Sequence, residues 1–215
     1  MAPTPSNALA GTRVLVVGAG IGGLAVALAL QRRGFDVVVY ERASELREIG
    51  AGVIIQPNGR RVLADLGVHD ALAARSSCVT SMYSCDYATG EVIDKADNAA
   101  VARRYGTPSL AVHCADLHGV LLEAVLANDF GAVDAGHDFA SLDQHGGGVE
   151  VRFANGVADR AAVVIGADGI SVLGRAFAAS RPPLSRRGLP APPASADRCG
   201  GAARSDRRAR AAANS

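Results

Sequence analysis

The stretch Arg13-Val-Leu-Val-Val-Gly-Ala-Gly-Ile-Gly-Gly-Leu24 joins a run of β-branched residues to a cluster of glycines. Such an apolar run before Gly18 is typical of a strand buried on both faces. Gly18, Gly20 and Gly23 form the G-x-G-x-x-G spacing, and a helical period of Leu and Ala continues to Gly34, the expected C-cap. This order of strand, glycine turn and helix is the setting in which the spacing binds a dinucleotide pyrophosphate.

Each glycine of the spacing has its own physical role in such a turn. Gly18 permits the tight turn, Gly20 lets the backbone approach a pyrophosphate, and Gly23 lets helix and strand pack closely. The first amides of the helix would face the anion. A second buried strand, 35–40, leads to Glu41, where an acidic side chain can accept hydrogen bonds from ribose hydroxyls. The alternative interpretation is a glycine-rich turn without a ligand.

The rest of the chain indicates an α/β fold with inserted antiparallel strands. Apolar residues spaced three and four apart predict helices, and alternation or short apolar runs predict strands. Asn155-Gly156 and Thr89-Gly90 are turn signals between such strands. The predicted elements are helices at 59–66 and 116–127, antiparallel strands within 78–94, and strands at 149–153 and 161–165.

Composition separates a globular part from a tail. The chain has 215 residues, of which 49% are hydrophobic and 20% charged, as in a soluble domain with a sizeable core. Residues 1–175 carry a net charge of −5, whereas residues 176–215 carry +6 and contain no Val, Ile, Lys or Glu. We therefore expect one domain over 1–175 and a disordered Arg/Ala/Pro-rich tail over 176–215.

Several function classes find no support in the sequence. The net charge of +1 does not favour a nucleic-acid partner, and the apolar runs are too short for a membrane span. No secretory signal is evident, so a cytoplasmic location is expected. His113 and His118 are interpreted as packing or surface residues, and no metal site is predicted. The cysteines are expected to be reduced, and they are Cys78, Cys85, Cys114 and Cys199.

Five motifs in order resemble the FAD-dependent aromatic-ring monooxygenases, the flavoprotein family that includes salicylate and hydroxybenzoate hydroxylases. The resemblance covers about residues 12–175. It rests on the segments Val16–Leu24, Tyr40-Glu-Arg42, Glu48–Asn58, His113-Cys-Ala-Asp-Leu-His118 and Gly166-Ala-Asp-Gly-Ile170.

The resemblance implies a Rossmann-like FAD-binding domain and a site on particular residues. The adenosine ribose would bind Glu41, with Arg42 beside the adenosine. The backbone of residues 50–54, which include Gly52 and Val53, would run along the ribityl and ring portion of the flavin. Asp168 would lie near the pyrophosphate and help bind FAD and NAD(P)H, the alternative being a structural turn aspartate. The residues implied for the pyrophosphate itself are Gly18, Gly20, Gly22 and Gly23, and Ile21 is also implied to bind the cofactor.

The activity that the resemblance implies is hydroxylation of a small aromatic substrate with FAD, NAD(P)H and O₂. No catalytic residue, substrate or oligomeric state is indicated. Two departures stand out: Cys114 occupies a position where the family usually has Arg, and the resemblance ends near residue 175, as in a truncated or frame-shifted chain. The alternatives are a non-catalytic FAD-binding fragment and a nicotinamide-dependent reductase, of which the segments 50–58 and 166–169 disfavour the reductase.

Overall fold

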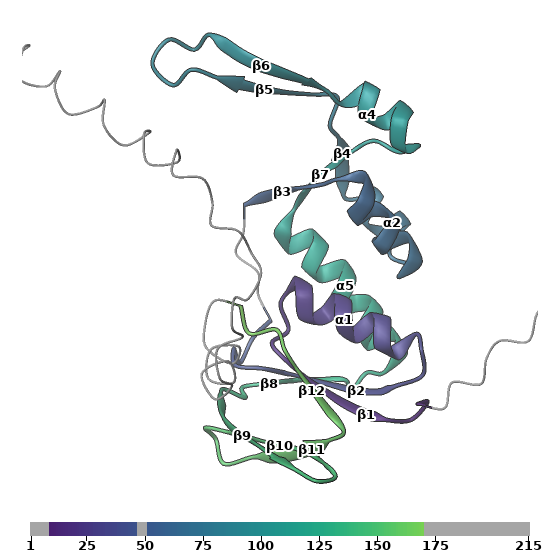
Figure 1. Cartoon of the computed structure of the whole chain (residues 1–215), viewed down its shortest axis with the longest axis vertical. Helices are drawn as coiled ribbons and strands as arrows, with labels where there is room; N and C mark the ends of the chain where they lie inside the picture. The colour runs from purple at the N-terminus through teal and green to yellow at the C-terminus, as the bar shows by residue number, and fades with distance from the viewer. Residues whose placement is uncertain (1–8, 47–50, 170–215) are drawn as a thin grey trace, which may run out of the picture. The chain divides into compact units, whose positions relative to one another are not determined.

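A parallel sheet forms the centre of the fold. The computed structural model describes residues 9–46 and 51–169. Within these ranges the sheet has the order β12-β1-β2-β8, and each neighbouring pair is parallel. Its strands are β1 (Arg13–Val17), β2 (Asp36–Glu41), β8 (Val133–Ala135) and β12 (Val163–Gly166). The first and last parts of the described chain therefore lie side by side in one sheet (Figure 1).

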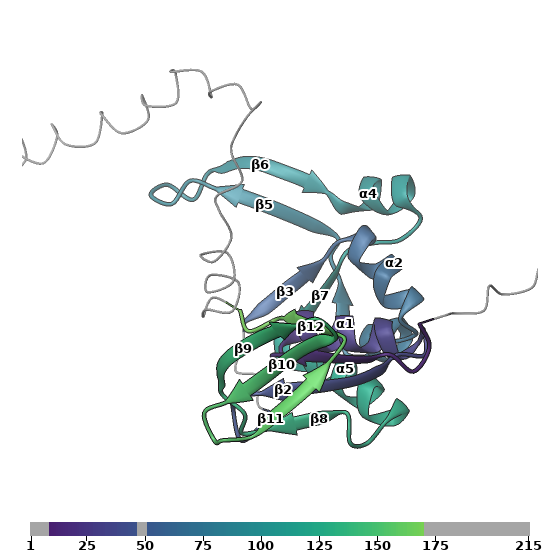
Figure 2. The same cartoon turned by 60° about the horizontal axis from the view of Figure 1, so that its bottom comes forward.

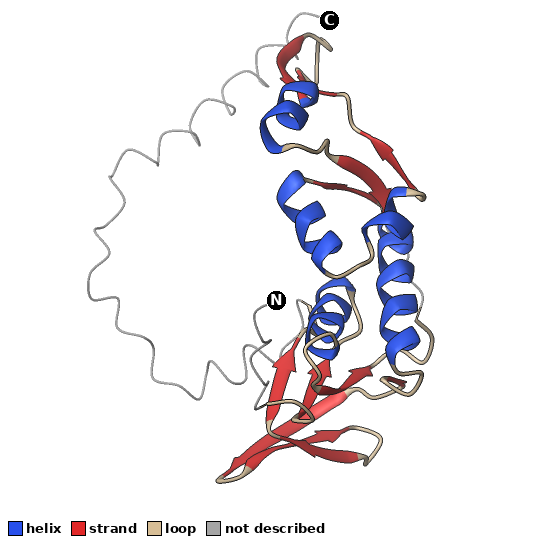
Figure 3. Cartoon of the chain, turned by 90° about the vertical axis from the view of Figure 1, so that its right-hand side faces the viewer, coloured by secondary structure: helices blue, strands red, loops and turns tan. Residues whose placement is uncertain are grey.

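Two helices cover one face of this sheet. They are α1 (Ile21–Gln31), which connects β1 to β2, and α5 (Cys114–Asn128), which precedes β8. The helices pack along each other, as Figure 3 shows from the side. The main core lies between helices and sheet, because alternate strand residues such as Val16 and Val39 point into the same apolar cluster as Leu24 and Leu121.

An antiparallel sheet covers the other face. Its order is β11-β10-β9, and Figure 2 shows it in front of the parallel strands. The intervening residues of β1 and β2, Leu15 and Tyr40, pack there against Val151 and Phe153 in a second core cluster. The strands are β9 (Phe139–His145), β10 (Gly148–Phe153) and β11 (Ala158–Ala161).

The segment between β2 and α5 adds further antiparallel strands and short helices. One sheet has the order β3-β7-β4, and β5 pairs with β6. The strands are β3 (Gly52–Ile55), β4 (Ser76–Cys78), β5 (Ser81–Cys85), β6 (Val92–Asp97) and β7 (Leu110–His113). The helices are α2 (Pro57–Asp65), α3 (His69–Ala73) and α4 (Asn98–Tyr105). Throughout the ranges that the structure describes, no helix is long and apolar enough to cross a membrane.

The predicted α/β class with inserted antiparallel strands is confirmed. The turn at Thr89-Gly90 does connect β5 to β6, and Asp86 stabilises it by accepting the amide hydrogens of Ala88 and Thr89. Cys78 and Cys85 lie on strands of different sheets and are free thiols, as is Cys114. The predicted tail over 176–215 lies outside the described residues, as does Cys199.

One predicted strand was wrong in its extent. The run 161–165 is divided between β11, which is antiparallel to β10, and β12, which is parallel to β1. The break falls at Ala162, whose amide donates to the carbonyl of Arg13 at 3.2 Å. The chain passes from one sheet to the other at this point. Because both strands are partly buried, their apolar residues form one continuous run, and the sequence pattern does not show where one strand ends and the next begins.

A polar network ties β11 to the parallel sheet. Asp159 accepts hydrogen bonds from Arg13 at 2.7 Å and from the Tyr40 hydroxyl at 2.8 Å. Burial raises the pKa of Asp159, but these hydrogen bonds outweigh burial and hold its pKa below the ordinary value. Burial and the bond to Asp159 raise the pKa of Tyr40. The carboxylate thus stabilises the fold in its charged form.

We expect Asp159→Asn to lower the free energy of unfolding by about 1–2 kcal/mol at pH 7, because charge-assisted hydrogen bonds are lost. A lowered folded-state pKa stabilises the fold above the unfolded pKa of about 4, and this stabilisation is lost as pH falls through the folded pKa. The difference between wild type and variant should therefore shrink below about pH 4. Urea unfolding measures it, with Tyr40→Phe as the control that removes one neutral donor. An equal difference at pH 3 and pH 7 would contradict the role of the charge.

Candidate functional site

The glycine loop between β1 and α1 contains two glycines that the fold itself requires. Gly18 has φ of +109°, and a Cβ there would overlap the carbonyl of Ala167, next to β12. A Cβ on Gly23 would overlap the carbonyl oxygen of Gly18. Packing of α1 against β1 and β12 therefore explains both residues without any ligand.

Gly20 is different, because the fold does not require a glycine there. Its φ of −69° and ψ of 177° suit any residue, and no described atom lies within 4 Å of where its Cβ would be. Gly20 is also the N-cap of α1, and no side chain of the described residues caps this helix. Uncapped first-turn amides and an open approach to the backbone are the features that an anion such as a pyrophosphate uses. The loop thus fits a dinucleotide.

Glu41, the last residue of β2, lies against the same loop. Its Oε2 accepts the Ala19 amide hydrogen at 2.8 Å, and its Oε1 accepts that of Ala43 at 3.0 Å. A carboxylate has about four lone-pair sites, so it can accept further hydrogen bonds while these two remain. The two backbone bonds fix the direction of the carboxylate beside the glycine loop.

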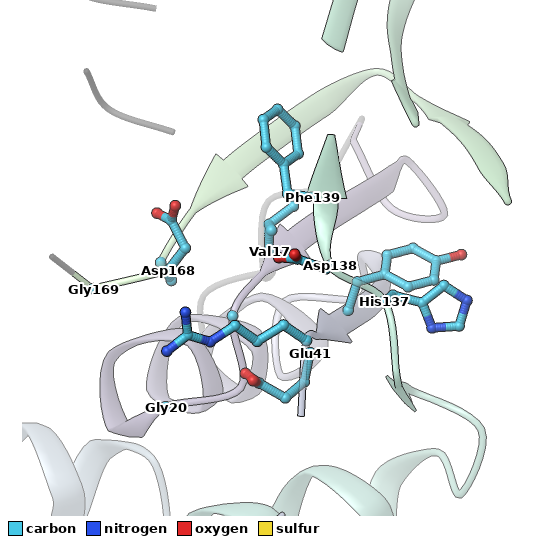
Figure 4. A pocket seen from close by; sticks show the side chains of 12 residues that line it. Val17, Gly20, Glu41, His137, Asp138, Phe139, Asp168 and Gly169 are labelled. Carbon is cyan, nitrogen blue, oxygen red and sulfur yellow. The ribbon is translucent and has the colours of Figure 1, made fainter. Parts of the chain in front are cut away.

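A pocket of about 470 Å³ opens at the carboxyl ends of β1, β2 and β12. This edge of a parallel sheet is where α/β proteins bind nucleotides. Figure 4 shows Glu41, His137 and Asp168 around it. The lining residues are Val17, Gly18, Gly20, Tyr40, Glu41, Arg42, His137, Asp138, Phe139, Ala167, Asp168 and Gly169.

The structure brings five of the sequence-predicted site residues to this pocket, namely Gly18, Gly20, Glu41, Arg42 and Asp168. Ile21, Gly22 and Gly23 form the first turn of α1 beside it, without lining it.

Gly52 and Val53, within the stretch predicted to run along the flavin, do not line this pocket. Gly52 and Val53 belong to β3, where they pair with His113 and Val112 of β7. The amide of Cys114 donates to the carbonyl of Ala51 at 3.2 Å, so Cys114 does lie next to this predicted flavin segment. Residues 48–50 of the same motif lie outside the described residues.

Sequence reasoning missed one wall of the pocket. His137, Asp138 and Phe139 follow β8, a three-residue strand without a clear apolar pattern. The His137 ring packs against Tyr40 and Phe153, with centroids 5.0 and 5.2 Å away. A further parallel strand next to β2 is expected after the helix predicted at 116–127, because α/β folds alternate helices and parallel strands. The residues that follow such a strand could therefore have been predicted to line the pocket.

His118 also contacts the glycine loop, although the sequence indicated only packing or a surface position. It is buried on α5, and its Nε2 lies 2.8 Å from the carbonyl oxygen of Ala19. Across the described ranges, no group of three or more His, Cys, Asp or Glu side chains could hold a metal ion.

Comparison with known proteins identifies the family. The FAD binding domain family matches residues 11–179, most of the chain. The chain belongs to this family. The match begins just before β1 and extends past β12, so it includes every strand whose end lines the pocket.

Two relatives of the chain are monooxygenases by name. The chain is 36% identical over 160 residues to 6-hydroxynicotinate 3-monooxygenase of Pseudomonas fluorescens, covering 74% of the chain and 41% of that enzyme. It is 38% identical over 172 residues to 3-amino-4-hydroxybenzoate 2-monooxygenase of Streptomyces cremeus, covering 79% and 43%. The chain thus spans about two fifths of the length of these relatives.

Solved structures of the family share the fold. HpxO of Klebsiella pneumoniae, in complex with FAD and uric acid, matches with a TM-score of 0.63 and 28% identity, covering 71% of this chain and 38% of that one. The tetrameric form of 2-methyl-3-hydroxypyridine-5-carboxylic acid oxygenase matches with a TM-score of 0.63 and 27% identity, covering 74% and 40%.

Proposed function

We propose that the chain binds FAD in the pocket at the ends of β1, β2 and β12. The observation that carries this proposal is Gly20, a glycine with open space before it at the uncapped N-terminus of α1. The pyrophosphate would bind the loop from Gly18 to Gly23 and the first turn of α1. The adenosine ribose would bind Glu41, with Arg42 and Asp168 also contacting the cofactor.

We further propose that the protein to which this domain belongs hydroxylates a small aromatic substrate with NAD(P)H and O₂. The names of the relatives support this reaction class. Bound FAD would supply the redox and oxygen chemistry. The residues of this chain would bind the cofactor, orient it and, through the apolar side chains beside β1 and β2, exclude water from its buried part. A cytoplasmic location is proposed for the same protein.

In this mechanism the residues of the described chain would bind the pyrophosphate and ribose of the cofactor. The amides at the start of α1 would meet the negative charge of the pyrophosphate, and the helix dipole favours an anion there. The Glu41 carboxylate would accept from two adjacent ribose hydroxyls while it keeps its bonds to Ala19 and Ala43. The Arg42 guanidinium would add a positive charge at the pocket wall.

The proposal is tested by the visible absorption spectrum of the purified chain, before and after incubation with FAD and desalting. Retained flavin bands would support the cofactor site and justify a screen of hydroxybenzoates and hydroxypyridines for substrate-dependent NAD(P)H oxidation. A colourless protein that takes up no FAD would refute the proposal.

A second candidate is FAD binding without hydroxylation by this chain alone. The observation that favours it is the coverage of about two fifths of the relatives' length. The two candidates share bound flavin and differ in one measurement, because only the first gives NAD(P)H oxidation that depends on the aromatic substrate and forms hydroxylated product.

Cys114→Arg is expected to tighten FAD binding about tenfold, because a guanidinium beside the predicted flavin segment adds a charged hydrogen-bond donor. The structure has Cys114 partly exposed at the start of α5, so a longer side chain can be accommodated. Flavin fluorescence titration measures the Kd. Cys114→Met, which adds length without charge, is the control and should leave the Kd unchanged. Equal affinities of the Arg and Met variants would contradict the prediction.

A further inference from the structure

His118 is a buried polar side chain in an apolar environment. It is 5% exposed and lies on α5 between Leu117 and Leu121, which belong to the main core. A buried polar group costs free energy unless it is hydrogen-bonded. Its Nε2 lies 2.8 Å from the Ala19 carbonyl oxygen. Because a carbonyl oxygen can only accept, Nε2 carries the proton in this bond and donates it.

The same residue of the loop is held from a second direction. The Ala19 amide donates to Oε2 of Glu41 at 2.8 Å. Thus two side chains, one at the end of β2 and one on α5, fix both backbone polar groups of Ala19. A small cavity of about 110 Å³ lies at this point, and Ala19, Gly20, Glu41 and His118 are among its lining residues.

Fixing the Ala19 carbonyl also fixes the amide of Gly20. The two groups belong to one planar trans peptide, so they point in opposite directions. With the carbonyl bonded to His118, the Gly20 N–H must point away from His118. Gly20 is the open glycine of the large pocket. An amide that is oriented before the ligand arrives binds it with less loss of entropy.

We propose that His118 is a positioning residue, which holds the Ala19 carbonyl and thereby orients the Gly20 amide for the FAD pyrophosphate. This inference rests on the proposed FAD site. His118 does not contact the cofactor in this scheme and acts through the loop. The donor at Nε2, rather than the size of the ring, is the property that matters.

Three variants of the full chain test the donor. His118→Leu removes it, His118→Gln offers an amide N–H as many bonds from Cβ as Nε2, and His118→Asn offers one that is a bond too short. We expect the Leu and Asn variants to weaken FAD binding about tenfold, or about 1.4 kcal/mol. The Gln variant should stay within about twofold of wild type. Flavin fluorescence titration gives the Kd.

A second readout uses the protein without FAD. Hydrogen exchange followed by mass spectrometry reports the protection of the loop peptide that spans residues 18–24. We expect about tenfold faster exchange there in the Leu and Asn variants, and wild-type exchange in the Gln variant. If the Leu variant does not fold, the Gln and Asn pair decides the question.

Leu117→Ala is the matched packing control, because Leu117 is equally buried on the same turn of α5 and belongs to the apolar core. It should lower the melting temperature and leave the FAD Kd unchanged. The inference is overturned if this variant weakens FAD binding as much as His118→Leu, if His118→Gln is as weak as His118→Leu, or if His118→Leu keeps wild-type affinity. Failure of the wild type to bind FAD would instead refute the proposed function, and any loop protection lost in His118→Leu would then reflect a purely structural bond.

Discussion

Gly20→Ala is expected to fold like the wild type and to bind FAD about 100-fold more weakly, a loss of about 2.7 kcal/mol. The backbone of Gly20 tolerates alanine, and its Cβ would meet no described atom. The same Cβ would project where the pyrophosphate must approach the amides at the start of α1, and each lost charge-assisted hydrogen bond costs about 1.5–3 kcal/mol. Flavin fluorescence titration measures the effect.

The loss of FAD affinity in Gly20→Ala should be compared with the change in the stability of the FAD-free protein. Alanine is a poorer N-cap than glycine, so a decrease of less than about 1 kcal/mol in the free energy of unfolding is expected. Urea unfolding monitored by circular dichroism measures it. Wild-type FAD affinity in the Gly20→Ala variant would show that no ligand approaches the loop closely, and the proposed site would have to be abandoned.

Gly23→Ala should have the opposite outcome, because here the fold requires the glycine. A Cβ at this position overlaps the Gly18 carbonyl oxygen, a backbone atom that cannot move without displacing α1 from β1. We expect the free energy of unfolding to fall by about 3 kcal/mol or more, with or without FAD. Thermal and urea unfolding of the FAD-free chain measure this loss.

Gly22→Ala is the matched control, one residue earlier in the same helical turn. No described atom lies within 4 Å of a Cβ at Gly22, and alanine favours a helix over glycine by about 1 kcal/mol. This variant should be as stable as the wild type or slightly more so. If Gly22→Ala and Gly23→Ala destabilise the chain equally, close packing is not the reason for Gly23.

The start of the fold was predictable because its signals are local. β1, the glycine turn, α1 and β2 follow each other within about thirty residues, and each has its own periodicity or spacing. The structure begins α1 at Ile21 and ends β2 at Glu41, within a residue or two of the predicted bounds. The antiparallel hairpins were equally predictable from the sequence, because Thr89-Gly90 and Asn155-Gly156 are strong turn signals.

Elements that depend on distant partners were not predictable in the same way. β8 has three residues, and β3, β4 and β7 form a sheet from segments that are far apart in the sequence, such as Gly52 and His113, so their pairing leaves no local pattern. The strand run 161–165 concealed a change of sheet for the same reason.

The residues of the candidate site likewise differ in whether the local sequence could predict them. Gly18, Gly20 and Glu41 follow from local spacing, and Arg42 and Asp168 came from a family resemblance rather than from their own neighbourhoods. His137 and His118 required three-dimensional information, since a histidine's partners cannot be inferred from its own position. His118 shows this most clearly, because its bond joins residues 99 positions apart.

The parallel pairing of β12 with β1 has a consequence for biosynthesis. The pocket wall at Ala167 and Asp168 emerges from the ribosome about 150 residues after the glycine loop that it must meet. A nascent chain that ends before β12 therefore has the loop without Ala167, the residue after β12 that packs on Gly18. Contacts of such long sequence separation form slowly. If FAD binds in the proposed pocket, its uptake can be used to report the completion of folding, because the pocket is complete only after β12 has entered the sheet.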